Sequence, residues 1–291
     1  MWEPGFPVRA HFENGSLLAG DWTCPRTVAG VGPEERAVHY EVWLHRVGSR
    51  GVHVGATQVV GDASSAVFVN AHEPVRPVYP GAERQRSTAI LLDAGLLRAL
   101  AGEVDERASG QAELRFPAAA APVSAETSLL HHALLGRVRT PEATALEVEE
   151  TALSLLRQLL RDARRGAGLR EPRGSRDLRA RELAEAVKHL LARRFSERLT
   201  LEEIGRGVGA SPFHLSRIFS AEVGVPIHQY LVRLRLRLAL ELMSQRPRDL
   251  SWVALEAGFA SHSHFTAAFR AEYGVPPSQV ARSGPRGAPR D

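Results

Sequence analysis

Leu215-Ser216-Arg217-Ile218-Phe219, followed shortly by Val223-Gly224-Val225-Pro226, decides the fold because both stretches return later in the chain. Fifty residues further on, the sequence reads Phe265-Thr266-Ala267-Ala268-Phe269 and then Tyr273-Gly274-Val275-Pro276. Other apolar and glycine positions upstream of each copy also correspond, at a spacing of 49 residues. Two copies of one supersecondary unit predict one task that is carried out at two adjacent places.

Each copy contains the parts of a helix-turn-helix. In the first copy, Thr200 and Glu203 form a capping box that starts a short helix over Leu201–Gly207. Gly209 supplies the left-handed residue of the turn, and Ser211 caps the next helix, which has a proline at its first position. The second copy repeats this pattern with Asp249 as the first cap, a helix over Leu250–Ala257, Gly258 in the turn and Ser261 as the second cap. Small Gly205 is expected to let the two helices of the first unit cross closely.

The second helix of each unit is predicted to read DNA with its outward face. Leu215, Ile218 and Phe219 form the apolar face of the first copy, and the remaining positions point away from it. The predicted DNA contacts are Phe213, His214, Ser216, Arg217 and Ser220 in the first unit and His262, Ser263 and Thr266 in the second. Arg217 can donate two hydrogen bonds to guanine, whereas its counterpart Ala267 cannot. The second helix-turn-helix unit is therefore expected to discriminate less strongly between bases.

A helix over Ile227–Gln245 is predicted to join the two units. Its 19 residues correspond to a rod of about 28 Å, which suits two readers in successive major grooves roughly 34 Å apart. Its predicted buried stripe consists of Leu231, Leu234, Leu238 and Leu242. Arg233 and Arg237 are predicted to lie with Glu241 on another face, where the two arginines would contact phosphates.

The charge of the chain is divided between its two halves. The net charge is +4 over 291 residues, but residues 1–165 carry 17 Lys+Arg and 20 Asp+Glu, a net of −3. The remaining 126 residues carry 20 and 13, a net of +7, so the positive charge accompanies the repeat. No apolar run approaches about 18 residues, and no signal pattern opens the chain, so no membrane segment is expected and the cytoplasm is the expected location.

The N-terminal half is predicted to be a small antiparallel β-barrel or sandwich with helices, which makes the whole chain an α+β protein of two domains. The strand candidates are Val38–His45, Val52–Val60, Ala66–Val69 and Thr88–Leu92, and helical pattern begins near Asp93. Ser124 is predicted to cap a helix to about Arg137, and Pro141 to open a longer one to about Arg165. The apolar stripe of the longer helix, which includes Leu146 and Leu155, would bury against the barrel, against a second subunit, or against both.

The predicted boundaries follow composition. Residues 1–165 form the sensor or dimerisation domain, residues 166–176 a linker rich in Gly, Arg and Pro, residues 177–283 the DNA-binding domain and residues 284–291 a disordered tail.

The sequence gives weak signals for any small-molecule chemistry in the N-terminal half. It contains no catalytic triad elbow, phosphate loop or dinucleotide fingerprint, so we predict that the protein is not an enzyme and needs no cofactor or metal. His39, Glu41, His45 and His53 lie on candidate strands but lack a metal-ligand spacing. The lone Cys24 is more readily explained as a small core residue than as a redox sensor. Trp22, Tyr40, Trp43 and Phe68 are interpreted as core, with the lining of an effector pocket as the alternative.

The C-terminal repeat resembles the DNA-binding domain of the AraC (arabinose-regulator) family over about 105 residues, roughly 180 to 283. The resemblance is carried by Leu201-Glu202-Glu203-Ile204, Val208-Gly209-Ala210-Ser211, His214–Phe219, Arg235-Leu236-Arg237-Leu238-Ala239, Ala257-Gly258-Phe259, Phe265, Phe269, Gly274 and Pro277. It implies a bipartite DNA-binding domain joined to a sensor or dimerisation domain. By position it implies first-unit contacts at Phe213, Ser216 and Arg217, and second-unit contacts at His262, Ser263 and Thr266.

Some residues depart from the family pattern, and a second resemblance concerns the other half. Gly205 stands where the family favours alanine, Trp252 where an acidic capping residue is common, and Ala267 where arginine is frequent. The N-terminal half looks like a cupin-type sensor domain through Leu17-Leu18-Ala19-Gly20, Cys24-Pro25, the strand from Val38, Val67–His72 and Tyr79-Pro80-Gly81.

The resulting hypothesis is a transcriptional regulator that binds double-stranded DNA through two helix-turn-helix units. A homodimer is expected, a small-molecule effector in the barrel is left open, and RNA polymerase is a partner if the protein is an activator. Three alternatives remain: a cupin-type enzyme with an accessory DNA-binding domain, a constitutive architectural DNA binder, and an alkyl-transfer DNA-repair enzyme. The last would need a reactive cysteine within a zinc site, and Cys24 is the single cysteine.

Overall fold

The computed structural model describes residues 8–24, 29–55, 57–79, 85–105, 113–166, 175–245 and 249–283. The described residues divide into two compact units, with residues 8–166 in the first and residues 175–281 in the second. Most of the predicted linker, 167–174, and the whole predicted tail, 284–291, lie outside the described residues. Within the described ranges, no helix has the length and apolar character that crossing a bilayer requires.

The strands of the first unit form two antiparallel sheets. The first sheet has the order β1-β2-β10-β5-β8-β11, and the second has β3-β9-β6-β7, with β4 also paired to β9. The strands are β1 (Arg9–Glu13), β2 (Leu17–Thr23), β3 (Gly30–Val31), β4 (Glu35–Arg36), β5 (Tyr40–Val47), β6 (Arg50–Val54), β7 (Thr57–Gly61), β8 (Ser65–Val69), β9 (Pro74–Tyr79), β10 (Arg86–Leu92) and β11 (Ala120–Pro122). The α+β prediction for the chain is confirmed.

One strand prediction needs correction. The segment Val52–Val60, predicted as a single strand, is the hairpin β6–β7, in which Val52 pairs with Val59. Gly55 has a φ of 57° and lies at the turn between the two strands, where a left-handed residue is needed. Gly55 in the middle of the stretch was the signal for this reversal.

Both faces of the first sheet are buried, although the alternation along β5 indicated one apolar face. Val42 and Leu44 belong to a core on the helix-covered face, whereas Trp43 belongs to a second core that also contains Val52 and Val59 of the other sheet. The second core therefore lies between the two sheets. Polar residues at alternate positions of β5, such as Glu41, are consequently inside the protein and not on its surface.

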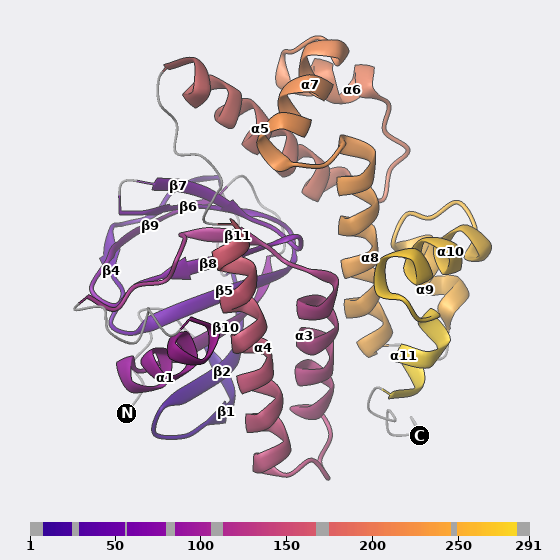
Figure 1. The fold of residues 1–291 in the computed structure, drawn as a ribbon. Helices are drawn as coiled ribbons and strands as arrows, with labels where there is room; N and C mark the ends of the chain where they lie inside the picture. Colours follow the sequence, from indigo (N-terminus) through magenta and orange to yellow (C-terminus); the bar gives the residue numbers. More distant parts are fainter. Residues whose placement is uncertain are drawn as a thin grey trace. The chain divides into compact units, whose positions relative to one another are not determined.

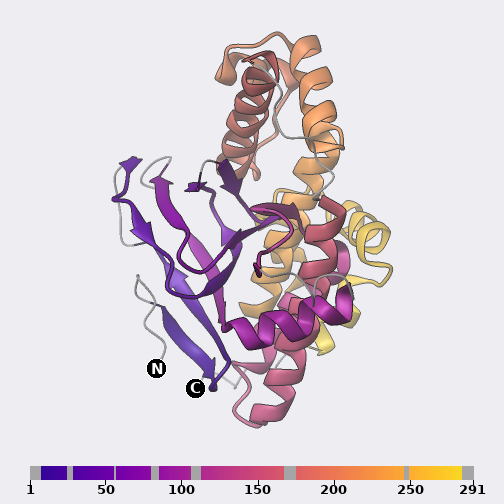
Figure 2. The same cartoon turned by 60° about the vertical axis from the view of Figure 1, so that its left-hand side comes forward.

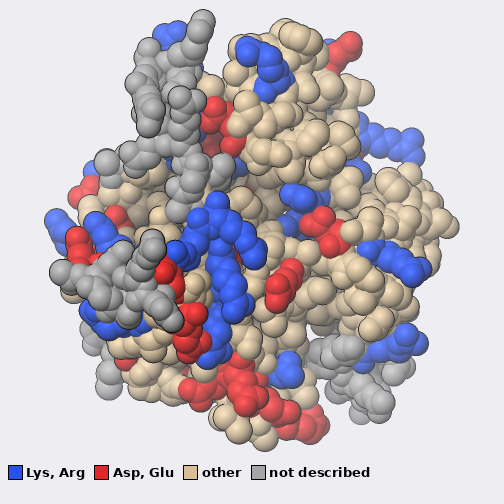
Figure 3. Space-filling model, in the orientation of Figure 1, with Lys and Arg blue, Asp and Glu red and all other residues tan. Residues whose placement is uncertain are grey.

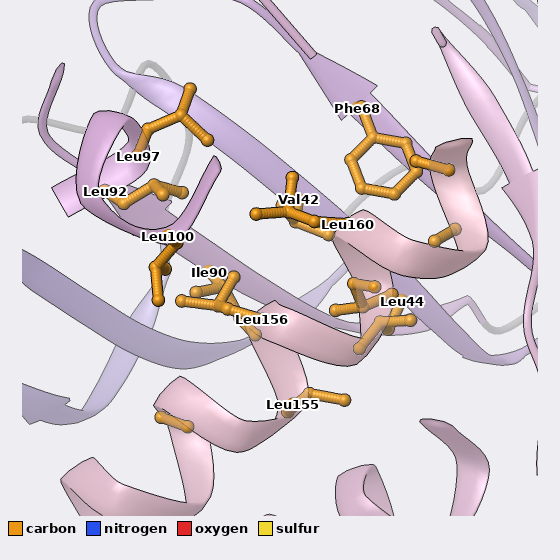
Figure 4. Packing of buried hydrophobic residues seen from close by; sticks show 14 of the residues in the cluster. Val42, Leu44, Phe68, Ile90, Leu92, Leu97, Leu100, Leu155, Leu156 and Leu160 are labelled. Carbon is orange, nitrogen blue, oxygen red and sulfur yellow. The ribbon is translucent and has the colours of Figure 1, made fainter. Parts of the chain in front are cut away.

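Three helices cover the outer face of the first sheet: α1 (Ala94–Val104), α3 (Ala125–Arg137) and α4 (Ala145–Gly166). Figures 1 and 2 show α3 and α4 side by side along this sheet. Figure 4 shows leucines of α4 and α1 meeting Val42, Leu44, Phe68, Ile90 and Leu92 of the sheet. The apolar stripe of α4 is thus buried against the sheet of its own unit, and a contact of this helix with a second subunit stays a prediction.

The start of α4 differs from the prediction, whereas the start of α3 agrees with it. Ser124 caps α3, as predicted, by accepting a hydrogen bond from the Thr127 amide. The helix α4 begins at Ala145 and not at Pro141, because Thr144 and Glu147 exchange the hydrogen bonds of a capping box. As a result Leu146, predicted to widen the buried stripe, lies in the first turn with its side chain 64% exposed.

The second unit consists of helices. These are α5 (Ser175–Arg194), α6 (Leu201–Val208), α7 (Pro212–Val223), α8 (Ile227–Gln245), α9 (Leu250–Glu256), α10 (His262–Tyr273) and α11 (Pro277–Ser283). Helix α8 links the two helix pairs α6–α7 and α9–α10 (Figure 1). Of its predicted stripe, Leu231 and Leu234 are buried while Leu238 and Leu242 are half-buried, and Leu236 and Leu240 are buried in addition.

Candidate nucleic-acid interface

The turn of the first helix-turn-helix has the capping box and the left-handed glycine that the sequence predicts. Thr200 and Glu203 form the capping box of α6, and Gly209 ends that helix with a φ of 70°. The Ala210 amide donates a hydrogen bond of 2.9 Å to the Gly205 carbonyl, which closes the turn by a main-chain bond. A Cβ atom at Gly205 would lie 2.5 Å from the Ala210 carbonyl oxygen. A side chain at Gly205 would therefore meet the backbone of the turn that leads into α7, so the small residue lets α6 and this turn pack closely.

The second turn has the same main-chain closure. The Phe259 amide donates to the Ala254 carbonyl, and the Gly258 amide donates to the Leu255 carbonyl, each at 2.9 Å. Gly258 has a φ of 83°, which matches the left-handed conformation of Gly209 in the first turn. The repeat in the sequence is therefore a repeat in the backbone, as predicted.

Helix α7 presents most of its predicted contacts to solvent. Ser211 caps the helix at the His214 amide, and Leu215 and Phe219 are fully buried on its inner side. The side chain of Phe213 is 82% exposed, which is unusual for an aromatic residue without a partner surface. Of the other predicted contacts, His214 and Arg217 are exposed, and Ser216 and Ser220 are half-buried.

Helix α10 repeats this arrangement with different side chains. Ser261 caps the helix at the His264 amide, and Phe265 and Phe269 are fully buried. His262 and Ser263 are exposed as predicted, whereas Thr266 is half-buried with its hydroxyl oxygen covered.

Sequence reasoning missed one exposed residue on α10. His264 is exposed at the N-terminal end of the helix and stands edge-on to Phe259, with ring centroids 5.4 Å apart. The spacing of fifty residues pairs His264 with His214, so the repeat itself was the signal that could have found it.

The N-terminal halves of both helices suit an anionic partner. Within α7 and α10 the acidic residues are Glu222 and Glu272, and both lie in the last turn. The first turns thus combine exposed amide donors with no negative side chain, which favours phosphate near the helix N-termini. Arg217 is exposed and makes no ion pair within the described part of the chain, so its guanidinium is available.

The two arginines predicted to contact phosphates from α8 lie in a different environment. Arg233 pairs with Glu272 at 3.4 Å, and its side chain is 39% exposed. Arg237 also faces Glu272, at 3.9 Å, but its side chain is only 6% exposed. Arg237 and Glu241 are therefore buried, because α10 packs over this side of α8, and of the two arginines predicted to contact phosphates Arg233 is the more accessible.

A third arginine of α8 connects the two helix-turn-helix units. Arg235 donates from Nε to the Phe195 carbonyl at 2.7 Å and from a terminal nitrogen to the Glu197 carbonyl at 2.8 Å. The same Nε lies near Gly258, at 3.1 Å from the position of a Cβ atom there. The guanidinium of Arg235 thus joins the loop before α6 to the linking helix and lies next to the second turn. It therefore helps to hold the two helix-turn-helix units relative to each other.

The N-terminal unit does not bring the candidate pocket residues together. Tyr40 and Phe68 pack with Phe116 on the helix side of the first sheet. Trp22 and Trp43 meet edge to face between the two sheets, with centroids 5.8 Å apart. The four aromatic residues therefore belong to two cores on opposite faces of one sheet, and they cannot line a single pocket.

The histidines and Cys24 show no metal-ligand geometry. Within the described ranges, no group of three His, Cys, Asp or Glu residues could hold a metal ion. His45 is buried and shares a hydrogen bond of 2.8 Å with Ser87, and burial lowers its pKa to about 3. Glu41 accepts a hydrogen bond from the Trp43 indole, and burial raises its pKa to about 7. Cys24 is half-buried and not in a disulfide.

Two capped helices on two matching turns, joined by one helix, define a bipartite helix-turn-helix domain for binding DNA. Residues 204–283 match the profile of a family described as "Helix-turn-helix domain". This part of the chain is therefore a helix-turn-helix domain.

The chain is similar to known transcriptional regulators over this domain. It is 30% identical over 93 residues to the probable transcriptional regulator LumQ of Photobacterium leiognathi, covering 32% of this chain and 38% of that protein. It is 34% identical over 98 residues to the HTH-type transcriptional regulator ArgR of Pseudomonas aeruginosa, covering 34% of this chain and 30% of that protein. The matches thus span well under half the length of these curated relatives. A crystal structure of unsaturated fatty acid bound wild-type ToxT from Vibrio cholerae aligns with 100% of both chains at 15% identity and a TM-score of 0.36.

Proposed function

We propose that the protein is a sequence-specific transcriptional regulator that places α7 and α10 in adjacent major grooves of DNA. The observation that carries this proposal is the duplicated main-chain turn, which sets two capped helices with exposed outer faces on one linking helix. Proteins whose DNA-reading helices follow such turns insert the N-terminal end of the helix into the groove. The similarity to transcriptional regulators over the same residues supports this use of the domain.

We propose that helices α7 and α10 differ in how strongly they discriminate between bases. On α7, exposed Arg217 can donate bidentately to guanine, and exposed Phe213 can contact a thymine methyl group. On α10, Ala267 replaces the arginine, and the exposed polar side chains near the N-terminus are His262, Ser263 and His264. We therefore assign base discrimination mainly to α7, with Ser216 and Ser220 beside it. Helix α10 adds contacts to the sugar-phosphate backbone of DNA and weaker contacts to bases. Half-buried Thr266 contributes little to these base contacts.

We propose that the N-terminal unit mediates homodimerisation through the exposed face of α4. Figure 3 shows Lys and Arg side chains gathered over one part of α4 and Asp and Glu side chains below them. Exposed Glu147 and Glu150 lie in its first half, and exposed Arg161 and Arg164 lie in its second half. Two copies of α4 in antiparallel orientation would bring each acidic half against the basic half of the other copy.

We also propose partners other than DNA for this regulator. We propose that the N-terminal unit responds to a small-molecule effector and that, where the protein activates transcription, the DNA-bound dimer contacts RNA polymerase. A constitutive architectural role would need no effector and no preferred base sequence. A cupin-type enzyme would need a metal or another catalytic group in the N-terminal unit.

Selection of binding sites from random duplex DNA with the full-length protein tests the proposal. The expected result is a motif of two boxes about one helical turn apart, with stronger base preference in one box. A dimer would give a doubled motif. Binding without any enriched sequence, which disappears between low and moderate salt, would contradict sequence-specific reading and favour the architectural alternative.

A further inference from the structure

A buried arginine without a counter-ion lies between the two sheets of the N-terminal unit. Arg50 is on β6 and shares a face with Val52 and Val54, which belong to the core between the sheets. The residue is 5% exposed, and within the described residues it has neither an ion pair nor a hydrogen-bond acceptor for its Nε atom. A buried guanidinium is costly unless an anion or several acceptors compensate it.

Three aromatic rings lie close to this guanidinium, but its buried Nε donor has no partner among the described residues. The central carbon of the group lies 4.7 Å from the ring centroid of Trp22, 5.4 Å from that of Tyr79 and 5.9 Å from that of Trp43. Such contacts stabilise a cation over the ring faces, yet they accept no hydrogen bond along its edge. The edge of the guanidinium is therefore free to bind a planar anion with two parallel hydrogen bonds.

Further unpaired polar atoms lie beside Arg50. The indole nitrogen of Trp22, which is 2% exposed, donates to no group in the described part of the chain. Gln85 is 1% exposed and donates to the Ser49 carbonyl at 2.9 Å, while its side-chain oxygen has no partner among the residues that the structure describes. Buried polar groups in native proteins are nearly always paired, so several orphaned atoms around one charge indicate a missing occupant.

The acidic residue of this core does not serve as the occupant. Glu41 is 3% exposed and is engaged by the Trp43 indole at 2.9 Å. Burial raises the pKa of its carboxyl to about 7 in spite of the attraction of Arg50, so near neutral pH it is only partly charged. His45 on the same strand carries no negative charge in either of its ordinary states. Among the described residues, none therefore forms an ion pair with Arg50.

We propose that Arg50 and Trp22, whose Nε and indole donors between the two sheets are unpaired among the described residues, bind the carboxylate group of a small organic acid. The surrounding walls are aromatic and aliphatic, including Val52, Val67 and Leu91, so the body of the ligand is apolar. A single guanidinium matches one negative charge, whereas a phosphate dianion would leave charge uncompensated. This inference rests on the proposed function in one respect, because it identifies the chemical class of the effector.

Binding assays with the full-length protein test this assignment directly. The probes are sodium acetate, hexanoate, benzoate and phenylacetate, with benzamide, phenylacetamide and inorganic phosphate for comparison. We expect at least one of the apolar acids to change the tryptophan fluorescence, and its amide to bind at least tenfold more weakly in calorimetric titration. Absence of binding across all four acids, or equal binding of acid and amide, would overturn the proposal.

Two variants distinguish a ligand-binding arginine from a structural one. Arg50→Met removes a buried unpaired charge and keeps its volume, so the ligand-free variant should unfold at a higher temperature than the wild type while losing carboxylate binding. Trp22→Phe keeps the aromatic wall but deletes the indole donor, and it should weaken binding about tenfold. Arg76→Met, an exposed arginine on β9, is the matched control and should change neither property. A lower unfolding temperature for Arg50→Met would contradict the proposal.

The outcomes separate this inference from the proposed function. A protein that enriches a two-box DNA motif but binds none of the carboxylates refutes the inference alone. A protein that binds a carboxylate through Arg50 but enriches no DNA sequence refutes the proposed function alone. Enrichment of DNA that changes at least threefold in affinity when the bound acid is added would support both.

Discussion

A Cβ atom at Gly258 would lie 2.7 Å from the Cα atom of Ser196, in the loop that precedes α6. The second turn therefore packs directly on the backbone beside the first helix-turn-helix, at a place where no side chain fits. Arg235 binds the carbonyls on either side of Ser196, so one small region determines how the two readers are placed. Glycine at this position is fixed by sterics as well as by its φ of 83°.

Gly258→Ala should destabilise the protein more than an ordinary left-handed glycine replacement. The added methyl group meets backbone atoms of Ser196 and Phe195, which cannot move aside like a flexible side chain. We expect a loss of about 2–4 kcal/mol in the free energy of unfolding, measured by urea denaturation. Gly274→Ala is the control, since its φ is 75° but no atom lies within 4 Å of the new Cβ, and it should cost about 1–2 kcal/mol. Equal losses would show that the contact with Ser196 does not constrain the turn.

Arg217→Ala should weaken binding to the selected DNA site by about 1–3 kcal/mol and relax the preference at one base position. The physical reason is the loss of two hydrogen bonds from an exposed guanidinium that has no partner in the described protein. Fluorescence anisotropy with the selected duplex and its single-base variants measures both effects. Arg76→Ala, on the surface of the other unit, should leave affinity unchanged. Wild-type affinity for the Arg217 variant would remove this residue from the interface.

Arg235→Met should uncouple the two readers without abolishing either. It deletes the hydrogen bonds to the Phe195 and Glu197 carbonyls while retaining an apolar side chain on α8. Each charged hydrogen bond contributes about 1.5–3 kcal/mol when intact. We expect affinity for the two-box site to fall at least tenfold, and tolerance of altered box spacing to increase. Lys188→Met, which removes a half-buried pair with Glu185, is the control, and a similar effect from it would contradict the assignment.

Arg161→Glu should weaken the proposed dimer, and adding Glu150→Arg should restore it. In an antiparallel pair of α4 helices, residues 150 and 161 of the two copies are equidistant from the helix centre and face each other. The single reversal places like charges together, whereas the double reversal recreates the opposite-charge pair. Sedimentation velocity at low and high salt measures the association. A double variant as weak as the single one would place the dimer interface elsewhere.

Glu41→Gln should change how stability depends on pH. Between pH 4.5 and about 7, folded Glu41 holds a proton that the unfolded chain releases, so its contribution to stability decreases as pH rises. His45 acts in the opposite sense below pH 6.5, because its folded pKa of about 3 keeps it neutral while the unfolded chain is protonated.

The glutamine variant should therefore lose stability more steeply than the wild type on acidification from pH 6.5 to 5. The difference in slope should be roughly 1.4 kcal/mol per pH unit. At pH 8 the variant should be the more stable protein, since it buries no carboxylate. Urea titrations at each pH provide the measurement, with exposed Glu13→Gln as the control. Parallel stability curves for wild type and Glu41→Gln would show that Glu41 is ionised in the fold.

Local sequence signals predicted local structure well. Ser124, Ser211 and Ser261 cap helices where they were expected, because a cap depends on two or three neighbouring residues. The start of α4 was predicted at Pro141, although the Thr144–Glu147 capping box, which marks the observed start, is also present in the sequence. Helical periodicity placed Phe213, Arg217 and His262 correctly at exposed positions of α7 and α10, but it missed His264.

Features that depend on distant residues could not be predicted. Arg237 is buried because Glu272, 35 residues later, comes to lie beside it, and no periodicity on α8 announces that partner. Arg50 was not recognised as a candidate, because its environment consists of Trp22, Trp43 and Tyr79 from other strands. The separation of Trp43 from Phe68 likewise depends on which face of the sheet each residue occupies.

The closure of both turns by main-chain hydrogen bonds has a consequence for the divergence of such proteins. The bonds from Ala210 to Gly205 and from Phe259 to Ala254 involve no outward side chain of α7 or α10. Substitutions on the outer faces of α7 and α10 can therefore accumulate while both turns remain intact. The two helix-turn-helix units can consequently diverge independently of each other. A duplicated unit of this kind can acquire a new target one half-site at a time, and an engineer can retarget it by exchanging surface residues alone.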